Sequence, residues 1–596
     1  MSVRTLSLLC IICCQCIFAL EDESLEKVSI CRNETLKPKV NTANIIIESE
    51  STTELSFFSQ SAECWKCKLR LTARINPGAT CYLRVDSRWP VHFKIKDEEG
   101  DLCQETTFHF KENGIYNLLI YNRTQCSQEL TNDPSDVFIP IYISMAVVFV
   151  IILLRYAFYF KSSVTFRRII SRFSQEKLIE ADLGSPDSIN PTDDNESLRS
   201  RILVRERLKS LDAFRGISIV NMIFVNCGGG KYWFFKHSPW NGINTADLVF
   251  PWFVFIMGTS MAYSFRSMMR KELKKQTIIA KIVWRTVVLF FFGIIINTIN
   301  KPNIELKDIR IPGVLQRIAV TYFIVSVTHM FSARPADSHQ FVWWSPIQDL
   351  VNYWLDWVVA LSLLIIYLCV TFCLPVPGCP TGYLGPGGIS DDGKYKNCTG
   401  GAAGYIDRTV FGSSHMYQRG TFMEMYHTHE PFDPEGLLGT LTTCVICFLG
   451  LQAGKIFLMF RMHSERVKRF FIWGVVIGAI ALALTEASRD GGVIPINKNL
   501  WSVSYIFAAA SLAFFMLALC YLAIDVGNIW TGIPFTWAGM NAIVLYMGHE
   551  VFVCKFPVYW KIESNHLSHY LMNLWGAAFW FIIAAFMHYK ELYFSV

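Results

Sequence analysis

The stretch from residue 208 to residue 265 reads LKSLDAFRGISIVNMIFVNCGGGKYWFFKHSPWNGINTADLVFPWFVFIMGTSMAYSF. It contains two apolar runs of membrane-spanning length, joined by a short loop in which His237 stands among glycines and tryptophans. Such runs predict two transmembrane helices, with the loop between them at the membrane surface. Because an imidazole can accept or relay a proton between two compartments, this loop is where the sequence predicts chemistry.

The composition of the whole chain is typical of a polytopic membrane protein. Of its 596 residues, 52% are hydrophobic and only 17% are charged, against roughly 25% charged residues in ordinary soluble domains. The formal net charge is +6, and the basic residues form short clusters beside apolar runs. Such clusters indicate orientation in a membrane, so we expect a lipid bilayer and no nucleic acid as partner.

Apolar runs recur along the chain and predict about eleven transmembrane helices, of which the second and the eighth are short. They lie at residues 137–160, 214–227, 246–265, 278–299, 312–331, 353–374, 437–460, 470–484, 501–523, 534–553 and 571–588. The predicted fold class is therefore a polytopic α-helical membrane protein with about eleven transmembrane helices, plus a small β-rich N-terminal domain.

Residues 1–20 are expected to form a secretory signal peptide that is removed. The apolar stretch from Leu6 to Leu20 is short for a span, and acidic residues follow it at once. A small residue, Ala19, stands near its end, as a signal peptidase requires. An uncleaved membrane anchor is the alternative interpretation.

Residues 21–135 predict a small β-rich domain outside the cytosol. Apolar and polar residues alternate in LRLTARI, CYLRVDS and VHFKIKD, and Asn113-Gly114 between FHFKE and IYNLLIY predicts a hairpin turn. Sequons at Asn33 and Asn122 and an even number of cysteines agree with an extracytosolic position. These cysteines are Cys31, Cys64, Cys67, Cys81, Cys103 and Cys126, whose pairing the sequence leaves open.

The predicted topology alternates from this luminal domain. It comprises the first transmembrane helix at 136–160, a cytosolic linker at 161–210, a multi-helix domain at 211–590 with a luminal loop at 375–436, and a cytosolic tail at 591–596. The arginine and lysine clusters then face the cytosol, as the positive-inside rule requires. The sequon at Asn195 is cytosolic and unglycosylated, whereas Asn397 is a third glycan site and Cys379 is a disulfide candidate with Cys398.

Several polar residues that are far apart in sequence are expected at the same luminal depth. They are Asn226, His237, Trp240, Asp247, Arg317, Lys498, His549 and Glu550. Charged groups in the apolar layer are costly and usually serve a pathway or a site. Their convergence therefore predicts a pocket that opens to the lumen.

Each of these residues also has a structural interpretation. His237 can be an interfacial histidine bonded to a carbonyl group, and Asp247 can cap the third helix. Arg317 can extend to the membrane surface, and His549 and Glu550 can pair between helices. The sequence alone does not decide between these roles.

No metal site is expected. His427 and His429 stand two residues apart in a loop, without the helical spacing of a zinc protease motif. No phosphate-binding loop, dinucleotide fingerprint or hydrolase elbow is present in the sequence. On the residues alone an enzyme and a secondary transporter of a sugar or ion are equally good interpretations, and a non-catalytic glycan-binding receptor is a third class.

Four ordered motifs resemble the lysosomal heparan-alpha-glucosaminide N-acetyltransferase family. They are SLDAFRGISIVNMIFVNCGGGKYWFFKHSPWNGINTADLVFPWFVFIMG from 210, IPGVLQRIAVTYF from 311, PINKNLWSVSYIF from 495 and GMNAIVLYMGHEVF from 539. The resemblance extends from about Leu208 to the last helix and is looser in the N-terminal domain and the linker.

This resemblance implies an acyltransferase that moves acetyl from cytosolic acetyl-CoA, used as a co-substrate, across a membrane. The acceptor is the terminal non-reducing glucosamine amine of heparan sulfate in the lysosomal lumen. The family's active histidine corresponds to His237 and its neighbouring asparagine to Asn226; Ser238-Pro239 is the only part of the loop not assigned to the family pattern.

The other candidate site residues divide between the two substrates. Lys209, Arg215 and Arg285 stand where the phosphates of coenzyme A are expected, although helix-end cations more often determine topology. Lys498 and Arg317 are candidates to bind sulfates or carboxylates of the polysaccharide. Trp240 or Trp501 is a candidate to stack on a sugar face. Asp247, His549 and Glu550 complete the candidate substrate-binding residues.

Two mechanisms are open for His237. An amine is mostly protonated in an acidic lumen, so a base must remove a proton before the amine attacks the thioester, and imidazole is suited to that work. In this hypothesis Asn226 donates a hydrogen bond to the thioester oxygen. In the rival mechanism His237 itself takes the acetyl group as a covalent intermediate.

The end of the chain carries two tyrosine-based patterns, YKEL from Tyr589 and YFSV from Tyr593, which resemble lysosomal sorting signals. Short patterns of this kind arise readily by chance, so the expected lysosomal membrane location relies chiefly on the family. A homodimer is compatible with the sequence, which does not determine the oligomeric state.

Overall fold

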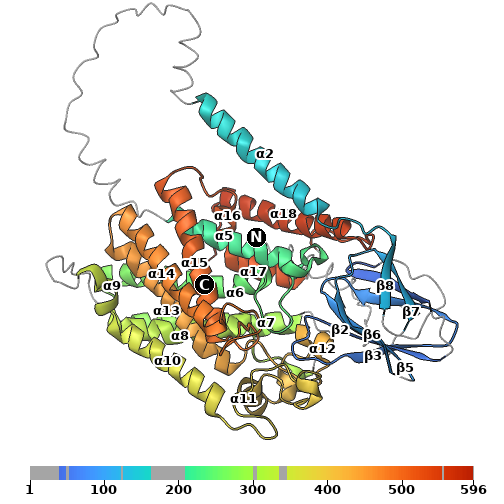
Figure 1. Cartoon of the computed structure of the whole chain (residues 1–596). Coiled ribbons are helices and arrows are strands. Elements are labelled where there is room, and N and C mark those ends of the chain that lie inside the picture. Colours follow the sequence, from blue (N-terminus) through green and yellow to red (C-terminus); the bar gives the residue numbers. More distant parts are fainter. Residues whose placement is uncertain are drawn as a thin grey trace, which may run out of the picture.

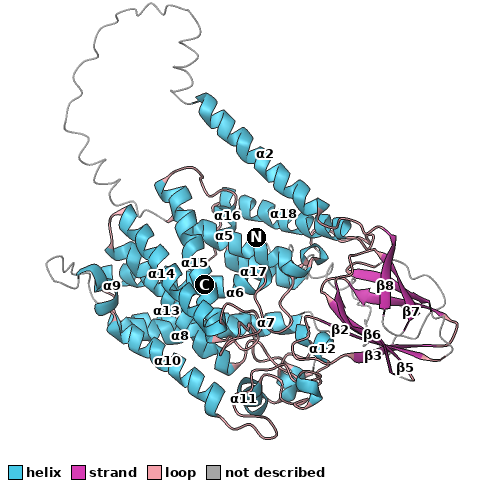
Figure 2. Ribbon diagram, viewed as in Figure 1, coloured by secondary structure: helices cyan, strands magenta, loops and turns pink. Residues whose placement is uncertain are grey.

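The computed structural model describes residues 39–48, 53–98, 100–122, 125–162, 208–299, 305–333, 345–552 and 556–594. The predicted signal peptide, Cys31, the sequons at Asn33 and Asn195, and most of the predicted linker at 161–210 lie outside these residues. Figures 1 and 2 show the strands gathered in a separate domain at one end of a bundle of helices. We call this end of the bundle the β-domain end.

The N-terminal domain consists of two four-stranded sheets with strand orders β4-β1-β7-β8 and β3-β2-β5-β6. The strands are β1 Thr42–Glu48, β2 Leu55–Ser61, β3 Arg70–Ile75, β4 Thr80–Asp86, β5 Val91–Asp97, β6 Gly100–Phe108, β7 Ile115–Asn122 and β8 Gln125–Asn132. Alternate residues of β1, including Ile45 and Ile47, are buried and share one core with Phe57 and Phe93 of the other sheet. Side chains alternate between the two faces of a strand, so the period-two pattern correctly predicted this β region.

The Asn113-Gly114 turn does not join a hairpin, contrary to the prediction. Asn113 has the expected positive φ of 61°, but β6 pairs with β5 whereas β7 pairs with β1 and β8. The turn therefore carries the chain from one sheet to the other. Local residue preferences fix a turn conformation, but the core decides which sheet each strand joins.

The remainder of the described chain is helical. The helices are α2 Ile139–Ser162, α5 Lys209–Asn226, α6 Thr245–Arg270, α7 Lys275–Ile299, α8 Val314–Ser332, α9 Gln348–Val351, α10 Trp354–Cys373, α11 Gly401–Phe411, α12 Thr421–Tyr426, α13 Leu437–Met459, α14 His463–Thr485, α15 Val503–Tyr521, α16 Phe535–Met540, α17 Ala542–Phe552 and α18 His566–Tyr589. Nine helices of the described ranges are long and apolar enough to cross a membrane. The fold class is confirmed, but the count of about eleven is not.

Two predicted spans, the second (α5) and the tenth, are not among the helices that are long and apolar enough to cross a membrane. Each has a physical reason. Helix α5 carries Lys209, Asp212 and Arg215 in its first two turns. The tenth span is broken into α16 and α17 at Asn541, whose backbone is not helical. Helix α14, predicted as a short span from 470, begins at His463 and is long enough to cross.

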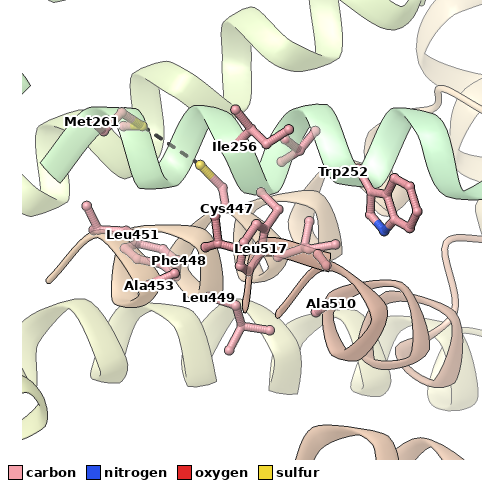
Figure 3. Packing of buried hydrophobic residues seen from close by; sticks show 14 of the residues in the cluster. Trp252, Ile256, Met261, Cys447, Phe448, Leu449, Leu451, Ala453, Ala510 and Leu517 are labelled. Carbon is pink, nitrogen blue, oxygen red and sulfur yellow. Dashed lines mark hydrogen bonds between the residues drawn. The ribbon is translucent and has the colours of Figure 1, made fainter. Parts of the chain in front are cut away.

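The centre of the bundle is α13, where 89% of the most apolar stretch is buried. It crosses α6 closely, and Figure 3 shows Ile256 and Met261 of α6 beside Cys447 of α13, with Trp252 further along α6. Glycines allow this approach, because a β-carbon on Gly450 would collide with the carbonyl oxygen of Phe255. Small residues at helix crossings are the usual means of close packing in membrane proteins.

Replacing Gly450 with leucine is therefore expected to destabilise the bundle by at least about 3 kcal/mol, the upper end of ordinary overpacking costs. The neighbour it meets is backbone, which cannot turn away as a side chain can. The thermal unfolding midpoint of the detergent-purified protein measures the effect. Ala479→Leu places a leucine at an exposed position of α14 and serves as the control. Equal midpoints for the two variants would show that the crossing tolerates a side chain.

Contacts from three segments attach the β domain to the bundle. His566 at the start of α18 bonds Glu112 through Nε2 at 2.9 Å and the carbonyl oxygen of Gly230 through Nδ1 at 2.8 Å. Arg489, in the loop before α15, forms an ion pair with Glu63. The segment from 375 to 436 contacts the domain as well, and the predicted Cys379–Cys398 disulfide is present in it. These contacts set the position of the β domain beside the loop that carries His237.

Candidate active site

His237 lies in the loop between α5 and α6, and 34% of its side chain is exposed. Its Nδ1 atom is 2.7 Å from Oδ1 of Asp247, a residue with no exposed side-chain surface. A contact of that length between a ring nitrogen and a carboxylate requires a proton between them, so Nδ1 carries it. In the neutral ring the lone pair is then on Nε2.

The start of α6 holds the Asp247 carboxylate in place. Its Oδ2 atom accepts hydrogen bonds from the backbone N–H groups of Asn244 at 2.9 Å and Ser238 at 3.1 Å. The first N–H groups of a helix lack partners within the helix, so an aspartate in the first turn is favourable there. Asp247 is thus a helix cap and the partner of His237 at once. The structure does not support its predicted role in substrate binding, because its side chain is completely buried.

Lys498 completes a triad of charges with these two residues. Its Nζ atom lies 2.9 Å from Nδ1 of His237 and 3.8 Å from Oδ1 of Asp247, and 14% of the side chain is exposed. Burial lowers the pKa of Lys498, against the attraction of Asp247 and Glu435. The ammonium group of Lys498 therefore faces the His237–Asp247 pair, and Lys498 does not line the cavity that opens beside His237.

A cavity of about 770 Å³, the outer cavity, opens beside His237 at the β-domain end. Its wall includes Asn226 of α5, His549 and Glu550 of α17, and Arg88 and Trp89 of the β domain. Of the candidate residues predicted at this depth, the structure thus brings His237, Asn226, His549 and Glu550 to one cavity. Charged groups that line a cavity at the end of a membrane bundle are typical of a functional site.

The amide of Asn226 is oriented by α17. Its Nδ2 atom is 3.0 Å from Nε2 of His549 and 3.1 Å from Oε1 of Glu550. His549 Nδ1 is 3.1 Å from the carbonyl oxygen of Leu545, which assigns its proton to Nδ1 and makes Nε2 an acceptor. Both hydrogens of the Asn226 amide are therefore used within the protein. This arrangement does not support the hypothesis that Asn226 donates to a thioester oxygen, and it leaves Oδ1 as the amide atom for a ligand.

A second cavity of about 340 Å³, the inner cavity, lies deeper in the bundle. Arg215 of α5 and Arg285 of α7 both line it, with Ser260 of α6 and Tyr546 of α17. Arg215 donates to the hydroxyl oxygen of Ser260 at 2.7 Å. Arg285 lies 4.5 Å from the ring centre of Tyr322, and its buried Nε has no hydrogen-bond partner among the described residues.

The two cavities follow one another along the same helices. Met222 of α5 and Tyr546 of α17 line the inner cavity, whereas Asn226 and Glu550, one turn further along each helix, line the outer cavity. At 1.5 Å per residue, four residues correspond to roughly 6 Å. The pair of cavities therefore reaches from the arginines inside the bundle to His237 at the β-domain end.

Six of the predicted site residues do not line either cavity: Asp247 and Lys498, described above, and Trp240, Trp501, Arg317 and Lys209. Trp240 is buried, donates from Nε1 to the carbonyl oxygen of Leu384 at 2.9 Å, and packs on Phe422. Arg317 is buried under Trp501 and donates to the carbonyl oxygen of Gly436 at 2.7 Å. These three side chains pack within the protein, so the structure does not support their predicted contacts with a sugar or its sulfates.

Lys209 is exposed at the start of α5 and does not line the inner cavity. Its predicted contact with the phosphates of coenzyme A is not supported. Conversely, the prediction missed Arg88, Trp89, Lys236 and Glu424, which all line the outer cavity. Lys236 and Trp233 stand near His237 in the sequence, and this nearness was the one sequence signal that pointed to further residues of the cavity wall. The residues of the β domain offered none, because its position on the bundle is a tertiary property.

The fold and the site define a polytopic helical membrane protein in which a buried aspartate presents a histidine to a cavity between the bundle and a β domain. Such a pair is suited to moving a proton during group transfer. The family model described as heparan-alpha-glucosaminide N-acetyltransferase, catalytic, matches residues 207–341.

Two curated relatives agree with that match. Heparan-alpha-glucosaminide N-acetyltransferase of Homo sapiens is 40% identical over 590 residues, which cover 94% of this chain and 88% of the relative. The protein of the same name from Mus musculus is 39% identical over 585 residues, with 94% and 89% covered. The chain belongs to the heparan-alpha-glucosaminide N-acetyltransferase family. It is an N-acetyltransferase, and the expectation from its motifs is confirmed.

Proposed function

We propose that this protein moves the acetyl group of cytosolic acetyl-CoA to the terminal non-reducing glucosamine amine of heparan sulfate in the lysosomal lumen. The observation that carries this proposal is the succession of two cavities along α5 and α17, with cationic residues at the inner one and His237 at the outer one. A donor and an acceptor that enter from opposite faces of a membrane need such a path to meet.

The inner cavity is the proposed site of the coenzyme. Arg215 and Arg285 are suited to hold its phosphates, because a guanidinium group binds phosphate oxygens through two parallel hydrogen bonds. The unpartnered Nε of Arg285 supports this, since a buried donor without an acceptor is costly until a ligand supplies one. The thioester end of the coenzyme would then extend along α5 toward Asn226.

The outer cavity is the proposed site of acetyl transfer. Nε2 of His237 takes a proton from the glucosamine amine, whose nitrogen then forms a bond to the thioester carbonyl carbon while the carbon–sulfur bond breaks. The coenzyme leaves as a thiolate, which takes the second proton that the nitrogen loses, and His237 releases the first proton to solvent. Glu550 and Oδ1 of Asn226 are placed to hold the amine, because both are acceptors on the cavity wall.

The rival mechanism uses the same nitrogen as a nucleophile. In it Nε2 of His237 forms a bond to the acetyl carbon and later passes the group to the amine. Incubation with radiolabelled acetyl-CoA in the absence of acceptor separates the two mechanisms. A labelled protein that transfers its label to glucosamine favours the rival, and sequential kinetics without a trapped species favour direct transfer.

Release of free thiol from acetyl-CoA tests the proposed function. With detergent-purified protein we expect thiol release that requires a glucosaminide acceptor and is lost in His237→Ala. Uptake of a sugar or ion into sealed vesicles without acetyl-CoA would instead favour the alternative function, a secondary transporter. Absence of thiol release both with and without the glucosaminide acceptor would refute acetyl-CoA as the donor.

A lysosomal membrane location belongs to the same proposal, with the β domain in the lumen and the C-terminus in the cytosol. The exposed Asn397 lies in the segment from 375 to 436, on the side of the β domain, where a glycan can be added. Asn122 ends β7 in the same domain. Loss of a glycan from Asn397→Gln, seen as a mass change, tests the orientation.

Lys498 is expected to stabilise the fold around the site. Its ammonium group lies 3.8 Å from the buried Asp247 carboxylate, and Lys498→Met removes that charge. Removing one partner of a buried ion pair costs about 3 kcal/mol or more, so the thermal unfolding midpoint of the detergent-purified protein is expected to fall. The exposed Lys561 provides the control variant Lys561→Met. Equal midpoints for the two variants would show that Lys498 does not stabilise Asp247.

A further inference from the structure

The β domain forms one wall of the outer cavity. Gln60 and Ser61 at the end of β2, and Asp86, Arg88 and Trp89 after β4, face the loop of His237 across it. The ion pair between Arg489 and Glu63 holds this wall against the bundle, and the Arg489 guanidinium lies 5.7 Å from the ring centre of Trp89. A ligand in the outer cavity therefore contacts two domains.

Arg88 presents a fixed set of donors to that cavity. Its Nε and Nη2 atoms donate hydrogen bonds to Oδ2 of Asp86, at distances of 2.9 Å and 2.6 Å. This pair fixes the plane of the guanidinium group and leaves the N–H groups of Nη1 for another acceptor. A guanidinium oriented in this way is suited to a planar or tetrahedral anion.

Lys236 supplies a second positive charge, which lacks a partner. No hydrogen bond or ion pair of its ammonium group is formed within the described ranges, although the residue is partly buried and lines the cavity. Burial lowers the pKa of Lys236, and the like charge of Arg88 lowers it further. An anion placed between the two cations would offset the cost of burying the Lys236 charge and its repulsion by Arg88.

Aromatic rings and carboxylates complete this part of the wall. Trp89 of the β domain and Trp233 of the loop after α5 lie 4.9 Å apart between ring centres, and both line the cavity. Glu424 lines it as well, and Asp86 is engaged by Arg88. The wall is therefore not simply cationic, and an anion would be selected by directed donors rather than by net charge.

From these contacts we infer that Arg88 and Lys236 form an anion subsite for a sulfate or carboxylate of the acceptor polysaccharide, next to its terminal glucosamine. The inference rests on the proposed function and extends it. The glucosamine amine lies toward Asn226 and Glu550, and the following sugar, which carries the anion, lies toward the β domain. The β domain thereby takes part in the selection of a charged polymer over a free amino sugar.

The position of Lys236 supports this division. It precedes His237 in the chain, so the two Cα atoms are about 3.8 Å apart and an anion on Lys236 lies close to the reacting end. Asn226 and Glu550 stand on other elements, α5 and α17, that face the same cavity. A sugar chain with a cationic end and an anionic neighbour thus meets groups of opposite charge in the same order.

Steady-state kinetics with two acceptors test the subsite. One acceptor is an uncharged aryl glucosaminide, and the other is a heparan disaccharide with terminal glucosamine followed by a uronate. Two variants test the subsite: Lys236→Gln, and Arg88→Lys, which keeps the charge but loses the paired N–H donors of the guanidinium group. Each is expected to raise KM for the disaccharide by roughly tenfold, the value of one charge-assisted hydrogen bond. KM for the aryl glucosaminide and both kcat values are expected to change less than about twofold.

The matched controls are Lys231→Gln and Arg74→Lys, which make the same two changes at exposed residues outside the cavity wall. Lys236→Gln leaves no carboxylate without its bonded partner, so it tests the subsite even if the Arg88 variant unfolds. An equal rise in KM for both acceptors, or none for the disaccharide, would overturn the subsite alone. Failure of the parent protein to acetylate either acceptor would overturn the proposed function and the subsite with it.

Discussion

Replacing His237 with alanine is expected to lower kcat for acetyl transfer by about 100- to 10,000-fold, the usual contribution of a positioned general base. The reason is the geometry of the ring, in which Nδ1 is bound to Asp247 at 2.7 Å and Nε2 is left for the cavity. Without the imidazole, no described side chain of that loop can take the proton of the amine. Binding of acetyl-CoA is expected to persist, because the inner cavity does not include His237.

The measurement is kcat for thiol release at saturating acetyl-CoA, together with the Kd of the coenzyme by titration. His92→Ala removes a histidine from the surface of the β domain, where it contacts only Thr107 through Nδ1 at 2.7 Å, and serves as the control. A His237 variant that retains more than a tenth of the parent activity would exclude both the base and the covalent mechanism. Loss of coenzyme affinity in the same variant would indicate a structural role.

Replacing Asp247 with asparagine is expected to reduce kcat to a similar extent, by about 10,000-fold if the pair behaves like other histidine–aspartate pairs. The backbone N–H groups of Asn244 and Ser238 both donate to Oδ2, so an asparagine must place its oxygen there. Its amide nitrogen then faces Nδ1 of His237 and donates to it. The ring proton is forced onto Nε2, and the base has the wrong tautomer.

Asp407 provides a matched control for this variant. It is buried at 1% exposure in α11, and burial raises its pKa to about 7. Asparagine resembles the protonated carboxyl, so Asp407→Asn is expected to keep fold and activity at acidic pH. Thermal unfolding of both variants separates a catalytic loss from a folding defect. If Asp247→Asn were as active as Asp407→Asn, the tautomer argument would be wrong.

Much of the fold was predictable from local patterns. Long apolar runs gave helices such as α10 and α13 near their predicted positions, because a helix in lipid needs only length and apolarity. Alternation gave the β region for the same kind of reason. The turn at Asn113-Gly114 was assigned wrongly to a hairpin because a turn sequence does not reveal which sheet receives the next strand.

The end of the bundle at which the site residues lie was predictable, but the direction of their side chains was not. Trp240, Trp501 and Arg317 are at the expected end of the bundle, yet they point into its core. An interfacial tryptophan has the same sequence signature whether it faces a ligand or packs on Phe422. Their burial could be learned only from the packing of α13 and the segment from 375 to 436 around them.

Local patterns were sufficient to predict the class of the protein, its family motifs and a position for His237 and Asp247 at the same end of the bundle. These depend on composition and on residues ten positions apart in one loop and helix start. The packing of distant segments decided which lysine reaches the imidazole, which arginines meet in the inner cavity, and that Arg88 of the β domain lines the outer cavity with His237. Arg215 and Arg285 are 70 residues apart and His237 and Lys498 are 261 apart, and such partners are selected by packing, which no single stretch of sequence encodes.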